Sequence, residues 1–305
     1  MATSRSGLAA LFLCLALVSG PAFAAHPQIT APYVTSSITV DGSAADWTAV
    51  KARQQGISFY KGDGRAGTSA TNTGTTICGT ISSENDCRVD LWAAHDGTHL
   101  FILAEVRDDA YEPLNSQAQG NMAYLEDTLH LYLDSTNARQ ANIPGSPIQN
   151  RYGYEQFGIS TDGNIYGENV DFNNSTSPQR RLAPLRSAPD GQYWQAKCQF
   201  SQPGPGYLYT FEESILMAGR AGYNMAPLTP GSSYGFNAEF CDADSGIQLQ
   251  GYIFWSSYSA IDAWNQENLW GTLNLAPVPE PATVGLLLWG ALLLRRTHRP
   301  GTGRA

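Results

Sequence analysis

Apolar residues recur at every second position in several short stretches of this chain. Leu129, Leu131 and Leu133 alternate with polar or aromatic residues, and residues 100–106 repeat the pattern. Successive side chains of a strand point to opposite faces, so the pattern predicts strands with one buried face. Turn-forming residues punctuate the chain, and no long stretch has helical periodicity. The chain is therefore predicted to be all-β.

Ten strands are predicted, enough for the two sheets of an antiparallel β-sandwich of immunoglobulin-like or jelly-roll-like type. Asp96-Gly97 is predicted to form a hairpin turn that Thr98 lengthens. The polar intervals 60–87 and 140–151 are predicted surface loops. The predicted strands are Ser37–Val40, Val89–His95, Leu100–Arg107, Thr128–Asp134, Tyr154–Ser160, Tyr193–Phe200, Tyr207–Phe211, Tyr234–Phe240, Gln250–Tyr258 and Gly271–Leu275.

Residues 1–24 have the order of a secretory signal peptide. Arg5 precedes an apolar run from residue 8 to residue 18, and the small-residue site Ala22-Phe23-Ala24 follows. The run is apolar all round, unlike an amphipathic core helix. We therefore expect signal peptidase to cleave before Ala25, leaving a domain of residues 25–276.

Residues 277–305 form a tail with three parts in order. Pro279-Glu280-Pro281 comes first, then the apolar residues 282–294, then a basic cluster that includes Arg295 and Arg296. The apolar part has 13 residues, whereas a stable transmembrane helix takes about 20, so its anchoring is marginal. Basic residues beyond it favour a cytoplasmic end, with the preceding domain outside.

This order resembles the PEP-CTERM sorting tail. The resemblance implies transient anchoring in the inner membrane through a short transmembrane helix. It also implies cleavage by an exosortase-type peptidase near Pro279 to Pro281. The protein would then reside on the outer surface or in the extracellular matrix. An ordinary C-terminal membrane anchor is the alternative interpretation.

The predicted domain is strongly acidic. Without the five arginines and one glutamate of the two ends, 13 basic and 26 acidic residues remain. This balance argues against nucleic acid or anionic lipid as a partner. It is typical of a soluble extracellular module and leaves room for a bound cation.

Four cysteines remain in the predicted domain: Cys78, Cys87, Cys198 and Cys241. An even number in an exported chain favours two disulfides, for which three pairings exist. We favour Cys78 with Cys87, within one loop, and Cys198 with Cys241, between two strands. A four-cysteine zinc site is the competing interpretation, but no Cys-x-x-Cys spacing supports it.

Short motifs occur in a fixed order along residues 38–275. They are Ile38-Thr39-Val40-Asp41-Gly42, Asp46-Trp47, Val89-Asp90-Leu91-Trp92, residues 100–109, residues 126–134, Tyr234-Gly235-Phe236-Asn237 and Trp270-Gly271-Thr272-Leu273-Asn274-Leu275. Together they resemble the family 9 carbohydrate-binding module, which shares its sandwich fold with DOMON domains. The resemblance implies a domain that binds polysaccharide non-covalently. The loops 60–87 and 171–191 depart from the family pattern, so the ligand is the least transferable part.

Sugar recognition needs aromatic faces for the C–H patches of a pyranose and polar side chains for its hydroxyls. Both kinds occur between residues 255 and 268, where we expect Trp255, Tyr258, Trp264, Asn265 and Gln266 to bind carbohydrate. Trp264 lies in a polar, turn-like stretch, where a tryptophan is otherwise hard to explain. A structural cap over the end of the sandwich is the alternative role for Trp264.

Aspartates at predicted strand ends are candidate ligands of a structural calcium ion. Asp108, Asp109, Asp127, Asp242 and Asp244 carry the hard oxygen ligands that calcium prefers. No EF-hand loop pattern is present. The alternative is that these carboxylates accept hydrogen bonds from turn backbones.

The chain contains no Gly-x-Ser-x-Gly elbow and no His-Glu-x-x-His pair. We therefore expect a binding protein rather than an enzyme. Two other classes remain open: a structural protein of the exopolysaccharide matrix without sugar affinity, and a divergent glycoside hydrolase with two carboxylates at a set separation.

Overall fold

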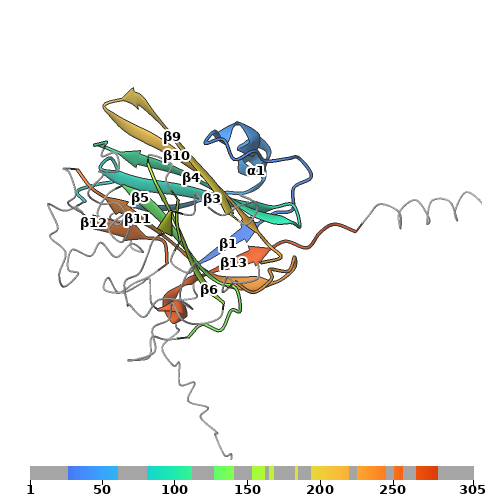
Figure 1. Cartoon of the computed structure of the whole chain (residues 1–305). Coiled ribbons are helices and arrows are strands. Elements are labelled where there is room, and N and C mark those ends of the chain that lie inside the picture. Colours follow the sequence, from blue (N-terminus) through green and yellow to red (C-terminus); the bar gives the residue numbers. More distant parts are fainter. Residues whose placement is uncertain are drawn as a thin grey trace, which may run out of the picture.

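The computed structural model describes residues 27–60, 81–111, 127–140, 153–161, 165–167, 183–184, 194–219, 225–244, 251–256 and 266–280. In this part of the chain, strands form two sheets that pack face to face, and the only α-helix is short (Figure 1). The predicted all-β sandwich is therefore confirmed.

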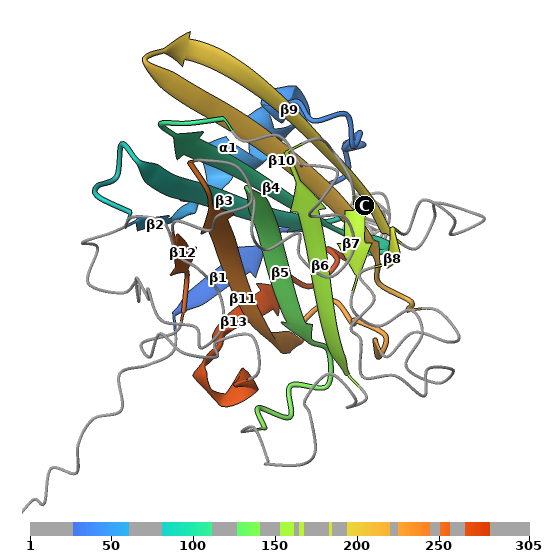
Figure 2. The same ribbon diagram turned by 60° about the vertical axis from the view of Figure 1, so that its left-hand side comes forward.

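One sheet has eight strands in the order β1-β13-β11-β5-β6-β7-β8, with β12 beside β11 (Figure 2). Its strands are antiparallel except for β1, which pairs with β13 in parallel. Their bounds are β1 Gln28–Ala31, β5 Thr128–Asp134, β6 Tyr154–Ser160, β7 Ile165–Gly167, β8 Ala183–Pro184, β11 Ser233–Asp242, β12 Gly251–Phe254 and β13 Gly271–Leu275.

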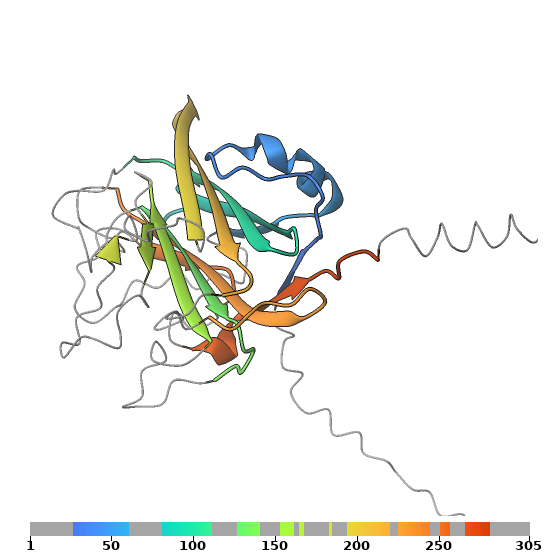
Figure 3. The ribbon, with the colours of Figure 1, turned by 45° about the vertical axis from the view of Figure 1, so that its right-hand side comes forward.

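The other sheet has five antiparallel strands in the order β2-β3-β4-β10-β9. The 3-10 helix η1 (Ala44–Trp47) and helix α1 (Thr48–Arg53) lie against its outer face (Figure 3). The bounds of its strands are β2 Ile57–Tyr60, β3 Cys87–His95, β4 His99–Asp108, β9 Trp194–Gly204 and β10 Gly206–Leu216.

The inner faces of the two sheets meet in one core. Leu129, Leu131 and Leu133 of β5 are at most 1% exposed and belong to the same cluster as Val89 and Leu91 of β3. The alternation seen in the sequence thus corresponds to inward and outward positions. Three predicted strands, Thr128–Asp134, Tyr154–Ser160 and Gly271–Leu275, have the observed bounds.

The predicted strand Ser37–Val40 is wrong, because this segment pairs with no neighbour. Ile38 packs instead into the cluster beneath η1 and α1. The loop that follows wraps around the carboxylate of Glu212, which is fully buried. One of its oxygens accepts hydrogen bonds from the backbone N–H groups of Asp41, Gly42 and Ser43, and the other from the Trp47 indole (2.7 Å). These side-chain contacts replace strand pairing here.

The predicted hairpin turn between β3 and β4 is confirmed, and Thr98 lengthens it. Gly97 has a φ of +88°, in the region that glycine tolerates best. The carboxylate of Asp96 accepts hydrogen bonds from the backbone N–H groups of Thr98 and His99, both at 2.7 Å. This turn sets the register between β3 and β4.

Neither predicted disulfide is present. Cys87, Cys198 and Cys241 are all thiols, and Cys78 lies outside the described residues. Cys198 belongs to β9 of the five-stranded sheet, whereas Cys241 belongs to β11 of the other sheet and points to its outer side. The favoured pairing of Cys198 with Cys241 was wrong because sequence spacing does not show which face of which sheet a cysteine occupies.

No helix among the residues covered by the structure is long and apolar enough to cross a membrane. The predicted signal peptide, the apolar stretch 282–294, Arg295 and Arg296 all lie outside those residues.

Glu213, whose side chain can ionise, lies inside the apolar core. Its carboxylate accepts a hydrogen bond from the Trp194 indole (2.9 Å), and its other oxygen has no partner among the described residues. Burial raises the pKa of Glu213 to about 8. The folded protein therefore holds Glu213 in its protonated form at neutral pH.

We predict that Glu213→Gln stabilises the protein increasingly as the pH rises from 5 to 8. The pKa of Glu213 is higher in the folded than in the unfolded state, so its contribution to stability is complete at low pH. That contribution is lost as the pH rises toward 8. At pH 7 the free energy of unfolding has fallen by roughly 3 kcal/mol relative to low pH. Urea unfolding at pH 5 and pH 8 measures the difference.

Glu105→Gln, which removes a half-buried carboxylate from the outer face of the same sheet, is the matched control. Equal effects of Glu213→Gln at both pH values would contradict the prediction.

Candidate functional site

Six aspartates gather at one end of the sandwich. Asp86 directly precedes β3, Asp108 ends β4 and Asp127 directly precedes β5, while Asp242 ends β11. Asp109 and Asp244 follow the last residues of β4 and β11 closely. The cluster therefore joins ends of strands from both sheets.

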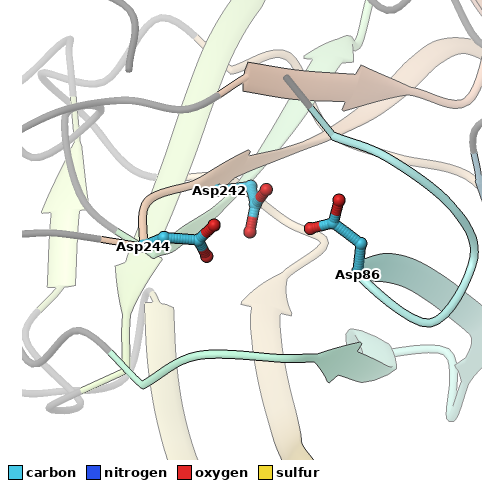
Figure 4. A group of neighbouring side chains, drawn as sticks. All are labelled: Asp86, Asp242 and Asp244. Carbon is cyan, nitrogen blue, oxygen red and sulfur yellow. The ribbon is translucent and has the colours of Figure 1, made fainter. Parts of the chain in front are cut away.

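The carboxylates form three overlapping groups of three. Within each group, one oxygen of every member lies within 4.8 Å of the others. Figure 4 shows one group, in which the carboxylates of Asp86, Asp242 and Asp244 lie around a common space. The other groups are Asp108 with Asp109 and Asp244, and Asp108 with Asp127 and Asp242.

Several of these carboxylates are buried without enough hydrogen-bond donors. Asp108 is 1% exposed and Asp242 is fully buried. One oxygen of Asp86, one of Asp108 and both of Asp242 have no partner among the described residues. Burial and the neighbouring negative charges raise the pKa of Asp108 to about 11 and that of Asp242 to about 9. Without a compensating positive charge, these two groups are held in the neutral form.

Neighbouring groups fix two of the aspartates. Asp127 accepts hydrogen bonds from the Tyr209 hydroxyl and from the backbone N–H of Ala243, both at 3.0 Å. Asp108 accepts one from the backbone N–H of Ala110 at 3.0 Å. Their oxygens are thus positioned by the fold before any ligand binds.

All five aspartates predicted as metal ligands therefore lie together. Asp86 was missed, because the stretch that contains it was interpreted as a surface loop. Its position could have been found by counting residues back from the Asp96-Gly97 turn, because Cys87 of β3 then stands opposite Asp108 of β4. The residue before Cys87 must then lie beside the end of β4.

This donor set fits a hard divalent cation. Calcium takes six to eight oxygen ligands, mostly from carboxylates and carbonyls, and the cluster offers only oxygen. Oxygens of Asp108 and Asp242 that have no hydrogen-bond partner in the described part of the chain are available for coordination.

A second group of polar residues lies on the outer face of the eight-stranded sheet. His130 of β5 stands opposite Glu239 of β11, and Tyr132 stands opposite Gln156 of β6. None of these four residues is more than 7% exposed. A row of buried polar groups on the side of the sheet away from the core is unusual, because such a face is normally either apolar or solvated.

Hydrogen bonds connect these residues. The Tyr154 hydroxyl donates to the amide oxygen of Gln156 (3.3 Å). The amide nitrogen of Gln156 approaches Nδ1 of His130 (3.1 Å) and donates to the Tyr132 hydroxyl (3.4 Å). The Tyr132 hydroxyl donates to the Glu239 carboxylate. Burial lowers the pKa of His130 to about 4, so its ring is neutral. With Nδ1 accepting from the amide, the ring proton is on Nε2, which has no partner among the described residues.

Aromatic rings border this row. The Trp270 ring lies 5.7 Å from the rings of Tyr132 and Tyr154, measured between centroids. On the other side, Tyr252 and Phe254 of β12 pack edge to face. The face therefore combines aromatic rings with carboxylate, amide and imidazole groups, the combination that recognises sugars.

The predicted carbohydrate-binding residues do not lie together in the described part of the structure. Trp255 is fully buried in the core, where its ring packs against Phe236 and leaves room only for a glycine at position 271. It presents no face to a ligand. Gln266 is partly exposed and precedes the 3-10 helix η6 (Glu267–Leu269). Tyr258, Trp264 and Asn265 lie outside the described residues.

Two facing sheets define the chain as a β-sandwich protein. The sequence matches the family described as carbohydrate family 9 binding domain-like over residues 65–277. The chain belongs to this family. Among curated proteins, no relative matches the sequence.

Solved structures have the same fold. A family 9 carbohydrate-binding module from Caldicellulosiruptor kristjanssonii, in complex with cellotriose, has 17% sequence identity and a TM-score of 0.53. The match covers 83% of this chain and 95% of that one. The corresponding complex with glucose has 17% identity and a TM-score of 0.54, over 83% and 98% of the two chains.

We predict that Tyr132→Phe lowers the free energy of unfolding by about 1–3 kcal/mol, because the buried Glu239 carboxylate loses a donor. Urea unfolding measures the change. Tyr33→Phe is the control, since no hydrogen bond of the Tyr33 hydroxyl joins it to the residues that the structure describes. Equal stability of the two variants would show that the Tyr132 bond contributes nothing.

Proposed function

We propose that this protein is an exported protein that binds polysaccharide non-covalently on the outer face of its eight-stranded sheet. The observation that carries the proposal is the connected row of His130, Gln156, Tyr132 and Glu239, bordered by Trp270. The family of the chain supports carbohydrate as the ligand. So do the cellotriose and the glucose that two structures of the same fold contain.

Each group in this row has a role in sugar recognition. Nε2–H of His130 would donate to ring or hydroxyl oxygens, and the Gln156 amide oxygen and the Glu239 carboxylate would accept from hydroxyls. An aromatic ring would stack on the C–H face of a pyranose. Because the row is at most 7% exposed, a sugar can reach these groups only if this face rearranges.

The described residues that follow the predicted binding stretch in the chain contact the same face. Trp270, which contacts Tyr132 and Tyr154, directly follows η6. Glu267 in η6 accepts a hydrogen bond from the backbone N–H of Gln140 (3.0 Å). We propose that Tyr258, Trp264, Asn265 and Gln266, which precede η6 in the chain, add stacking and hydrogen-bonding groups.

We also propose export through the predicted signal peptide, followed by sorting through the C-terminal tail. Residues 277–280 leave the domain as an exposed segment directly after β13, where an exosortase-type peptidase could reach them. Ala276 is held by His95 and by the backbone of Ala31. Cleavage beyond Ala276 would therefore leave the last strand in place. The resulting residence would be the outer surface or extracellular matrix, after transient inner-membrane anchoring.

A panel of plant and bacterial polysaccharides in affinity electrophoresis tests the binding proposal. We expect at least one polysaccharide to retard the protein. Gln156→Ala should weaken this by about tenfold or more, since a buried polar contact contributes about 1–3 kcal/mol. Trp264→Ala should also weaken it, because the ring proposed to stack on the sugar is removed. Gln195→Ala, an exposed change on β9 of the other sheet, is the control.

No retardation on any polysaccharide would overturn the proposal and favour a structural matrix protein. Release of reducing sugar, abolished by one Asp or Glu substitution, would favour the glycoside hydrolase.

We further propose that the aspartate cluster binds a structural divalent cation, with calcium as the best match to its oxygens. The buried oxygens of Asp108 and Asp242, which lack a hydrogen-bond partner among the residues that the structure covers, support this role. The cation would join the ends of β3 and β4 in one sheet to the ends of β5 and β11 in the other.

We predict that Asp242→Asn has opposite effects with and without calcium. In chelator, the variant should melt at a higher temperature than the native protein, because one buried acidic group with few partners is removed. In calcium, the native protein should be the more stable one. Calcium at 100 times its dissociation constant adds about 2.7 kcal/mol to a protein that binds it only when folded.

Differential scanning calorimetry measures both conditions, with the exposed Asp46→Asn as control. A melting temperature of the native protein that does not respond to chelator would disprove the cation site.

A further inference from the structure

Among the residues that the structure describes, helical segments cover only one half of the outer face of the five-stranded sheet. Trp47 and Val50, from η1 and α1, pack on Ala94, Phe101 and Leu103 of β3 and β4. The other half, built by β2 and the start of β3, carries partly exposed polar and aromatic side chains. These are Ser58, Tyr60, Arg88 and Asp90.

A pocket of about 480 Å³ opens to solvent in this uncovered half. It lies along β2, the edge strand of the sheet, and its volume is in the range of small-ligand sites. The indole of Trp92 lies behind it, so close to Gly56 that a Cβ there would be 2.4 Å from the ring. The lining residues are Gln55, Gly56, Ile57, Ser58, Tyr60 and Arg88.

Ion pairs hold the polar groups of the pocket in place. The Arg88 guanidinium donates to both oxygens of Asp90, with Nε–Oδ2 at 3.1 Å and Nη2–Oδ1 at 3.0 Å, and to Glu84 at 3.0 Å. It also lies over the Tyr60 ring, 5.3 Å from its centroid. The Ser58 hydroxyl donates to Asp90. Groups fixed in this way lose little conformational entropy when a ligand binds.

We propose that this pocket is a second saccharide-binding site, on the sheet opposite the first; the inference rests on the proposed function. The edge of Tyr60 and the apolar atoms around Gly56 and Ile57 would contact the C–H groups of a pyranose. The carboxylates of Asp90 and Glu84 would accept hydrogen bonds from hydroxyls, and the Gln55 amide would both donate and accept.

The ion pairs around Arg88 favour a neutral sugar as the ligand. Asp90 and Glu84 already bind the Arg88 guanidinium. A uronic acid or sulfated sugar would have to displace these carboxylates from the guanidinium. A neutral saccharide brings only hydroxyls, which the carboxylates accept.

Two sites on opposite sheets make the protein bivalent toward polysaccharide. The two outer faces point away from each other across the sandwich (Figures 1 and 2). A single molecule would therefore bind two glycan chains rather than two units of one chain. Such a protein would cross-link neutral polysaccharide in a matrix.

Isothermal titration of the purified full chain with cellotriose tests the second site. We expect two molecules of cellotriose per native chain, and one for Tyr60→Ala and for Gln55→Ala, an exposed change that should leave the fold intact. Tyr207→Ala, at a half-buried tyrosine of β10 outside the pocket, is the control and should bind two.

Light scattering with hydroxyethyl cellulose, a soluble neutral polysaccharide, tests cross-linking. The native protein should increase the scattering, whereas Gln55→Ala and Tyr60→Ala should bind the polymer without increasing it.

One cellotriose per native chain, or two for both pocket variants, would overturn the second site and leave the proposed function standing. Absence of binding to cellotriose and to every polysaccharide of the panel would overturn both.

Discussion

The pleat of the strands is the constraint on which the other features depend. Alternate residues of β3, β4, β5, β10 and β11 must enter the core between the sheets, so the intervening residues are committed to the outer faces. On β5, the leucines at 129, 131 and 133 go inward, and His130 and Tyr132 are consequently placed outside. On β10, Glu212 and Glu213 are neighbours in sequence and point to opposite sides of one sheet.

Buried carboxylates in this protein are accommodated in three physically different ways. Glu212 receives three backbone N–H groups and an indole N–H, which together replace its lost hydration. Glu213 has one donor, and its pKa rises to about 8, so that it is neutral in the fold. The aspartates at the strand ends lie too close together to be charged at once without a cation. The number of nearby hydrogen-bond donors therefore determines how each buried carboxylate is stabilised.

The candidate sites differ in how far they could be predicted. The five aspartates were identifiable because strand ends follow from alternation, and ends of neighbouring strands meet at one end of a sandwich. The row of His130, Gln156 and Glu239 was not, because it depends on the strand order β11-β5-β6. These residues are separated by 26 and 109 positions from His130 in the chain, and only pairing brings them together. The pocket beside Tyr60 depends similarly on β2, a strand without a clear alternating pattern.

The sequence by itself determined the all-β class, most strand positions, the turn at Asp96-Gly97 and the acidic ends of β4, β5 and β11. All of these follow from local periodicity and from the conformational preferences of single residues. Only the tertiary structure decided that Trp255 lies in the core and that Cys198 and Cys241 belong to different sheets. It likewise decided that the stretch from Ser37 to Val40 forms no strand, because Glu212, more than 170 positions away from Asp41, holds the loop after it. Contacts between distant segments are set by sheet order and burial, which no local pattern in the chain encodes.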